Sequence, residues 1–139
     1  MTPKEEQPVH YAVVRADLSF GVQAAMLMHA VGISVKEPHV DGMWALALHV
    51  RDEAHLMEVA GWLLKAGFGF VIYRDPDPPF NGAAMALGVA PTFERERLKK
   101  CLQRLPLVAS PPRASVQPQP AAPPVVAGSA VGRTTGGGQ

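Results

Sequence analysis

The apolar residues of this chain recur at spacings that predict alternating strands and helices up to about residue 105. Short runs rich in valine, leucine and aromatic residues are typical of strands, whereas apolar residues three and four positions apart are typical of helices. A polar or proline-containing connection separates each run from the next. The predicted strands cover residues 11–15, 43–50, 70–73 and 83–89, and the predicted helices cover residues 20–33, 53–66 and 91–105.

The ends of the predicted helices carry residues that favour a helix boundary. Ser19 precedes the first helix and Asp52 precedes the second, where each is placed to cap the chain. Gly67 stands at the expected end of the second helix. Pro91 and Thr92 are expected to open the third. The first helix is apolar nearly all round, so it is expected to pack on more than one side.

The order of elements, β-α-β-α-β-β-α, predicts an α/β fold. Helical crossovers make the first three strands parallel, with right-handed connections. The connection at 74–82 contains no helix, so the fourth strand is expected to run antiparallel to the third. We therefore predict a three-layer α/β/α domain around a mixed four-stranded sheet.

Length and composition favour one domain followed by a tail. The 139 residues leave room for one hydrophobic core, expected over residues 9–105. Residues 1–8 are polar and expected to be flexible, and the Pro/Ala/Gly-rich residues 106–139 are expected to be disordered. No secretory signal and no apolar run of membrane length is present, which predicts a cytoplasmic protein without membrane contact. Cys101 is alone, which excludes an intrachain disulfide and favours a core position.

The charge is nearly balanced. The formal net charge is +1, but Arg113 and Arg133 lie in the expected tail, so the domain itself is slightly acidic. Bulk charge therefore does not indicate a nucleic-acid partner, and no DNA partner is expected. The last helix is locally basic, which favours either phosphate contacts or an ordinary solvated face; its basic residues are Arg95, Arg97, Lys99, Lys100 and Arg104.

Candidate chemistry lies where the predicted parallel strands end, since open α/β sheets bind ligands at that edge. The amides at the start of the first helix, including that of Gly21, favour an anion there, although a plain capped helix explains the same residues. Arg74, Asp75 and Asp77 follow the third strand. They favour either a carboxylate that activates water or a solvated Asp-Pro turn.

His29 lies in an otherwise apolar helix. It is either a proton carrier at neutral pH or a hydrogen-bonded core residue. The remaining histidines lack the spacing of metal ligands, so no metal site is expected. The chain also lacks the glycine-rich nucleotide-binding motifs and the Gly-x-Ser-x-Gly motif of serine hydrolases.

Two stretches of the domain form a pattern together. The first runs from Arg15-Ala-Asp-Leu-Ser-Phe-Gly21 into Ala24-Ala-x-x-x-His29-Ala30, and the second is Arg74-Asp75 after the third predicted strand. The pattern resembles the type-II peptidyl-tRNA hydrolase family over about residues 11–105. The resemblance implies hydrolysis of the ester that joins a peptidyl group to the 3′ end of tRNA, so peptidyl-tRNA is the implied partner. It implies no cofactor.

The resemblance also implies roles for individual residues. Asp75 and His29 are the implied catalytic residues, and they would position the water that attacks the ester. Contacts with the substrate are implied for Arg15, Asp17, Gly21, Gln23, Arg74 and Asp77.

Two departures from the family pattern keep alternatives open. The family's lysines at the start of the first helix have no counterpart, and Pro76-Asp-Pro-Pro79 replaces its threonine-bearing loop. One alternative is therefore a catalytically impaired module on the same fold that binds RNA or protein. The apolar surface of the first helix also favours a two-fold contact between copies, which would make the protein a homodimer.

Overall fold

The computed structural model describes residues 7–35, 42–102 and 105–109. The chain divides into two compact units, Met1–Val108 and Ala109–Gln139, and the helices and strands of the described residues lie in the first. In chain order these are β1 (Val9–Arg15), α1 (Phe20–Ser34), β2 (Trp44–Val50), α2 (Glu53–Ala66), β3 (Phe70–Asp75), β4 (Ala83–Val89) and α3 (Arg95–Cys101).

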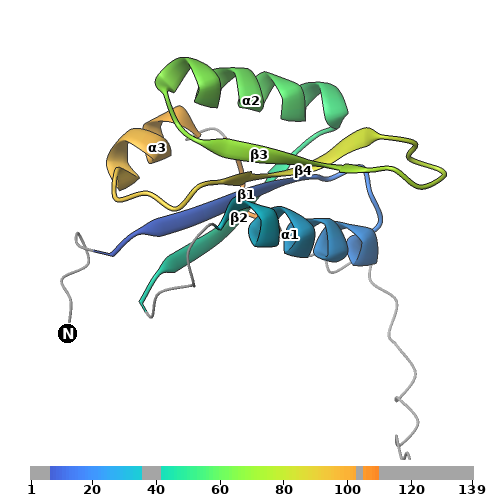
Figure 1. Ribbon diagram of the computed structural model, residues 1–139, viewed down its shortest axis with the longest axis horizontal. Helices are drawn as coiled ribbons and strands as arrows, with labels where there is room; N and C mark the ends of the chain where they lie inside the picture. The colour runs from blue at the N-terminus through green and yellow to red at the C-terminus, as the bar shows by residue number, and fades with distance from the viewer. Residues whose placement is uncertain (1–6, 36–41, 103–104, 110–139) are drawn as a thin grey trace, which may run out of the picture. The chain divides into compact units, whose positions relative to one another are not determined.

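The four strands form one mixed sheet in the order β2-β1-β4-β3 (Figure 1). Strand β1 runs parallel to β2, while β4 runs antiparallel to both β1 and β3. The predicted α/β fold, its element order and its strand directions are therefore confirmed.

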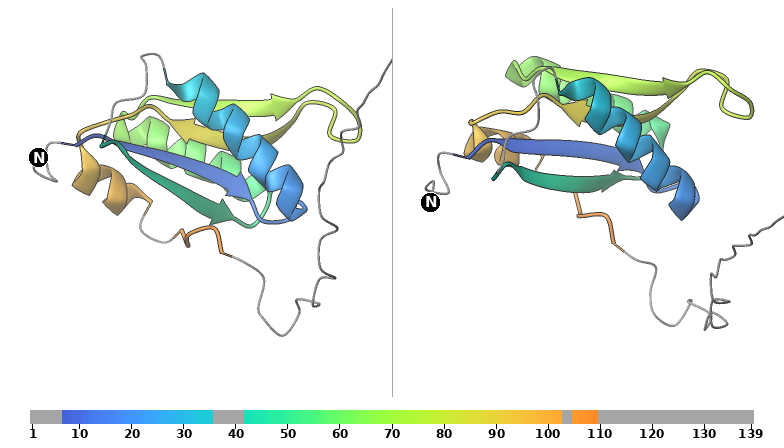
Figure 2. Two further views of the ribbon diagram at one scale, coloured as in Figure 1. Left: turned by 90° about the horizontal axis from the view of Figure 1, so that it is seen from below. Right: turned by 60° about the horizontal axis from the view of Figure 1, so that its bottom comes forward.

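The helices lie on both faces of the sheet, as predicted. Helices α2 and α3 cover one face, while α1 crosses the other over β1, β4 and β3 and leaves β2 beyond it (Figure 2). Strand alternation divides the core between these faces. On β1, Val13 points into the core beneath α2 and α3, and its neighbour Val14 points into the core beneath α1.

The helix boundaries agree with the sequence at α2 and differ at α3. The carboxylate of Asp52 accepts a hydrogen bond from the backbone N–H of His55, and Gly67 ends α2 with a left-handed φ of 83°. Ser19 occupies the N-cap of α1 but makes no capping bond with its side chain. The expectation that Thr92 opens α3 is wrong, because Thr92 exchanges backbone hydrogen bonds with Val9 and α3 begins at Arg95.

Helix α1 packs on one side only, in contrast to the expectation. Its buried residues are Gln23, Met26, Ala30 and Ser34, which recur at helical spacing on the face toward the sheet. Several large apolar residues on its other faces are exposed, among them Phe20 (62 %) and Met28 (75 %). None of the described helices is long and apolar enough to cross a membrane.

Backbone pairing continues past the expected domain boundary at residue 105. Leu105 is buried, and Leu107 forms an antiparallel bridge with Leu48 on the outer edge of β2. The backbone N–H of Val108 donates to the carbonyl of Ala47 at 2.9 Å. The first unit therefore includes residues 106–108, which the composition predicts to belong to the tail. The predictions for residues 1–6 and 110–139 lie outside the described residues.

Candidate functional site

The carboxyl edge of the parallel strands holds a cluster built around the backbone of Ala84. Arg15 Nη1 donates to the carbonyl oxygen of Ala84 at 3.0 Å, and Glu53 Oε2 accepts from its N–H at 2.7 Å. The same guanidinium donates to both carboxylate oxygens of Asp17, from Nε at 3.0 Å and from Nη2 at 2.9 Å. Arg15 thus links the end of β1 to the start of β4 and to the loop before α1.

The register of the sheet explains this cluster. Pairing between β1 and β4 stops at Val14 and Ala86, and the register of β3 against β4 shifts after Tyr73, so that Met85 is passed over. Ala84 is fully buried, and it lies on β4 past Ala86, the last residue that pairs with β1. An unpaired buried backbone group costs about 1–3 kcal/mol. At Ala84, the side chains of Arg15 and Glu53 therefore make the backbone hydrogen bonds that β1 makes farther along β4.

The ion pair also fixes the charge of its members. The hydrogen bonds from Arg15 lower the pKa of the Asp17 carboxyl, and the same contact raises the pKa of the Arg15 guanidinium. The Arg15 side chain is only 13 % exposed and all three of its guanidinium nitrogens have partners. Arg15 and Asp17, both implied substrate contacts, are thus engaged with each other and with the fold.

Gln23 lies in a second hydrogen-bonded group at this edge. It is buried, and its amide nitrogen donates to the carbonyl of Leu18 at 2.7 Å. Its amide oxygen is 2.6 Å from His49 Nε2 on β2. Since the amide nitrogen is committed to Leu18, the oxygen accepts from His49, which places a proton on Nε2. Gln23 therefore joins α1 to β2.

Asp75 shapes the loop that follows β3. Its Oδ1 accepts from the backbone N–H of Asp77 at 2.9 Å, and its carbonyl accepts from the N–H of Gly82 at 2.6 Å. Arg74 Nη1 donates to the carbonyl of Gly82 at 3.2 Å. The Asp-Pro turn, one of the two alternatives for this loop, is thus present as an Asx turn. No interaction within the described structure engages the other carboxylate oxygen of Asp75 or the carboxylate of Asp77.

His29 is exposed and stacks on Tyr73 of β3, with ring centroids 4.3 Å apart and planes 11° from parallel. Of the two alternatives for His29, the hydrogen-bonded core residue is therefore wrong. The helical turn carries His29 past the buried stripe of Met26 and Ala30, and Tyr73 supplies a flat surface beside it. No hydrogen bond joins His29 to Asp75 in the part of the chain that the structure describes. The two implied catalytic residues are not assembled as a pair.

The charge of the edge is acidic. The segments that follow β1, β2 and β3, residues 15–21, 51–53 and 74–82, carry five carboxylates and three guanidiniums. Gly21 is exposed in the first turn of α1. Within the described ranges no three His, Cys, Asp or Glu side chains gather as metal ligands. The excess of carboxylates disfavours the binding of phosphate at this edge. Its hydrogen bonds instead hold the strands and helices together.

Sequence reasoning missed two residues of this edge. They are Glu53 and His49: the sequence predicts Glu53 only as the first residue of the second helix, and His49 as one of the histidines without metal-ligand spacing. Their contacts depend on which strand lies beside β1, which no local pattern reveals. A weak signal was present for His49, because strand alternation places it opposite Leu48 and Val50, on the α1 side of the sheet.

The comparisons with known proteins leave the family open. No family model matches the chain, and no curated protein matches it. Among solved structures, a protein of unknown function from Agrobacterium tumefaciens strain C58 aligns with a TM-score of 0.49 and 16 % sequence identity. The alignment covers 74 % of this chain and 98 % of that one. A likeness at this level says nothing about activity or partners.

Proposed function

We propose that this chain is a protein-binding module on a peptidyl-tRNA hydrolase-like fold, and that it binds a second copy of itself through α1. The observation that carries the proposal is the surface of this helix. Its 15 residues include no Asp, Glu, Lys or Arg. We define the outer face of α1 by its exposed apolar residues, Phe20, Ala24, Ala25, Met28, Val31 and Ile33.

A groove beside α1 extends this surface toward β2. Its volume is about 210 Å³, and it lies where α1 leaves the sheet uncovered; the lining residues are His10, Ala12, Leu27, Val31, Ala45, Leu46 and Ala47. Stable interfaces bury about 800 Å² on each partner. One helix face supplies only part of that area, so the groove and the uncovered side of β2 are included in the proposed contact.

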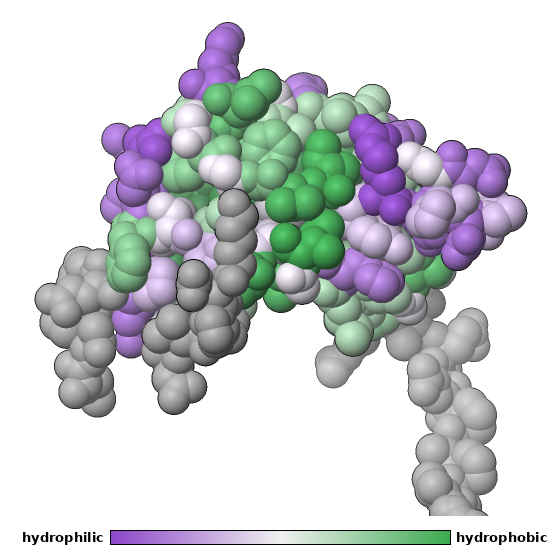
Figure 3. All heavy atoms as spheres, viewed as in Figure 1, coloured by the Kyte–Doolittle hydropathy of each residue, from purple (hydrophilic) through white to green (hydrophobic). Residues whose placement is uncertain are grey.

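The absence of charge on α1 favours a second copy as the partner. In a two-fold contact each residue near the axis meets its own equivalent, so a charged side chain there would face its like. Apart from His29, the exposed side chains of α1 are apolar, so the helix presents no carboxylate, ammonium or guanidinium group near such an axis. Apolar residues also gather over β3 and the adjacent part of α1 on one face of the molecule, with polar residues at the loop beyond them (Figure 3).

Sedimentation equilibrium of the full chain at tens of micromolar tests this proposal. We expect the mass of a dimer for the wild type and of a monomer for Met28→Glu. Leu64→Glu is the matched control, because Leu64 is 72 % exposed on α2 and lies outside the proposed contact. The proposal is overturned if the wild type sediments as a monomer at this concentration. It is also overturned if Met28→Glu and Leu64→Glu dissociate the dimer to the same extent.

The state of the sheet edge supports a binding module over an esterase. Arg15, Asp17 and Gln23 hold the fold together, and His29 stacks on Tyr73 instead of pairing with Asp75. A substrate that used these groups would have to displace internal hydrogen bonds, each worth about 1 kcal/mol or more.

Ester hydrolysis of peptidyl-tRNA is the second candidate function, and one observation favours it. Asp75 is half-buried at the sheet edge and has a carboxylate oxygen without a hydrogen bond in the described structure, so it can accept a proton from water. The test is release of N-acyl amino acid from N-acyl-aminoacyl-tRNA. If this candidate is right, Asp75→Asn lowers the rate by at least about tenfold, since general bases contribute about 10²–10⁴-fold.

Glu58→Gln is the control for this assay, because Glu58 is an exposed carboxylate on α2. Turnover by the wild type that Asp75→Asn removes and Glu58→Gln retains would replace the binding-module proposal by the enzyme. No turnover by the wild type removes hydrolysis and leaves the proposed dimer to its own test.

RNA binding without turnover is tested separately, by retention of tRNA on a filter at low salt. Lys99 and Lys100 on α3 make no ion pair in the described structure, whereas Arg97 is paired with Glu94. If RNA is a partner, Lys100→Glu weakens retention. No retention by the wild type at low salt excludes RNA, because phosphate contacts are strongest there.

A further inference from the structure

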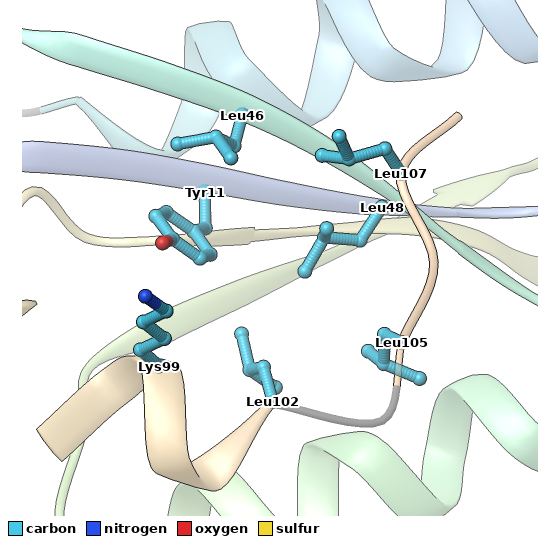
Figure 4. A pocket seen from close by; sticks show the side chains of 7 residues that line it. All are labelled: Tyr11, Leu46, Leu48, Lys99, Leu102, Leu105 and Leu107. Carbon is cyan, nitrogen blue, oxygen red and sulfur yellow. The ribbon is translucent and has the colours of Figure 1, made fainter. Parts of the chain in front are cut away.

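A pocket opens between β2 and α3 on the face of the sheet opposite α1. Its volume is about 250 Å³. Strands β1 and β2 form its floor, and α3 with Leu105 and Leu107 forms its wall (Figure 4). The lining residues are Tyr11, Leu46, Leu48, Lys99, Leu102, Leu105 and Leu107.

The hydroxyl of Tyr11 is an unpartnered polar group in this pocket. Tyr11 is only 6 % exposed, and no hydrogen bond reaches it in the described structure. Buried hydroxyl groups normally have a partner, which in an open pocket is either water or a bound group. The hydroxyl belongs to a residue that lines the pocket, so a group bound there is placed to supply the missing partner.

Lys99 provides a second polar group at the same end. Its ammonium makes no ion pair or hydrogen bond within the described ranges. Figure 4 shows the Tyr11 hydroxyl and the Lys99 ammonium on one side of the pocket, while Leu48, Leu105 and Leu107 lie on the other. The pocket therefore has a polar end with two hydrogen-bond donors and an apolar end made of leucine side chains.

We propose that this pocket binds a medium-chain monocarboxylate. An ammonium can only donate, and a phenol donates readily, so the group that satisfies both is an anionic acceptor. A single lysine matches the single charge of a carboxylate. About 250 Å³ accommodates about eight water-sized groups, each with a share of about 30 Å³. A hydrocarbon chain of about six to eight carbons fills the leucine-lined end.

Isothermal titration calorimetry with sodium octanoate and the full chain tests the proposal. For a ligand of this size we expect a Kd of about 0.1–1 mM. Octanol and octylamine have the same chain without the negative charge, so both are expected to bind about tenfold more weakly or not at all. Equal binding of either compound overturns the carboxylate assignment.

Octanoate binding by three variants tests whether the ligand occupies this pocket. Lys99→Met retains the length of the side chain and removes the charge, so it is expected to weaken octanoate binding about tenfold. Lys100→Met is the matched control on the same helix, because Lys100 is exposed and does not line the pocket. Tyr11→Phe is expected to weaken binding about threefold to tenfold, through loss of one hydrogen bond.

The comparison of Lys99→Met with Lys100→Met decides the proposal even if Tyr11→Phe folds poorly, because both lysines are exposed. Lack of saturable octanoate binding up to about 10 mM overturns it. Equal affinity of Lys99→Met and the wild type overturns it as well. The pocket shares Leu46 with the groove beside α1 but no residue with the outer face of α1, so Lys99→Met and Met28→Glu test the two proposals at separate residues.

Discussion

Gly88 on β4 and Ala30 on α1 bring a strand and a helix into backbone contact. A Cβ at position 88 would collide with the carbonyl oxygen of Ala30 and would lie 2.7 Å from the Cβ of Ser34. Ser34 occupies the same contact, since its hydroxyl donates to the carbonyl of Ala30 at 2.7 Å and lies 2.8 Å from His10 Nε2. Helix α1 therefore sits on the sheet at a distance that only glycine permits.

Gly88→Ala is expected to destabilise the protein by about 1–3 kcal/mol, because inserting a methyl group into packed backbone forces the helix to shift. Gly61→Ala is the matched control. Gly61 lies within α2 with open space at its Cβ position, so this change is expected to stabilise by up to about 1 kcal/mol. Urea unfolding of both variants measures the difference. Equal stability of the two would contradict the close approach.

Asp17→Asn is expected to remove the contribution of the Arg15–Asp17 ion pair to the free energy of unfolding, and this contribution decreases at low pH. Hydrogen bonds from Arg15 lower the pKa of Asp17 from its ordinary value near 3.8. The stabilisation is therefore fully present above about pH 3.8 and is lost as the pH falls through the lower folded-state pKa. Because the Asp17 side chain is 40 % exposed, the contribution is at most about 1 kcal/mol.

The measurement is urea unfolding of wild type and Asp17→Asn at several pH values between about 2 and 7. The difference between the two proteins should be constant near neutral pH and should shrink toward the acid end. Asp77→Asn is the control, because no interaction engages the Asp77 carboxylate in the described structure. A difference that grows as the pH falls would contradict the assigned ion pair.

Glu53→Ala is expected to cost about 1–3 kcal/mol, because it leaves the buried N–H of Ala84 without an acceptor. Glu53→Gln retains an acceptor oxygen and should recover most of that loss. Glu58→Ala, at an exposed position on the same helix, should change stability by less than about 0.5 kcal/mol. Thermal unfolding of the three variants provides the test, and equal losses at positions 53 and 58 would remove the role assigned to Glu53.

Tyr11→Phe is expected to stabilise the ligand-free protein by up to about 1 kcal/mol, because it removes a buried hydroxyl without a partner. For a domain of this size that is a rise in Tm of about 4–8 °C per kcal/mol. Saturating octanoate should then raise the Tm of the wild type more than that of the variant. A fall in Tm on substitution would show that the hydroxyl already has a partner.

Local sequence determined most of the secondary structure. Helix α2 was predicted with both ends, because Asp52, the apolar stripe and Gly67 act through neighbours within a few residues. Strand β4 was also predicted at its observed bounds. The start of α3 was missed, because Thr92 is held by Val9, which is 83 positions earlier in the chain. A backbone pair between distant residues does not change the spacing of apolar residues near either of them, so this spacing cannot predict it.

The tertiary structure alone decided what the candidate residues do. The sequence by itself placed Arg15, Asp17 and Asp75 near one sheet edge, since parallel strands end together. It could not determine that Arg15 binds Asp17 and Ala84, or that His29 stacks on Tyr73, because those partners depend on strand order, the register shift in β4 and the rotation of α1. The pocket of Tyr11 and Lys99 likewise joins residues from opposite ends of the domain. Periodicity determines which face a side chain takes, while packing determines which group it meets.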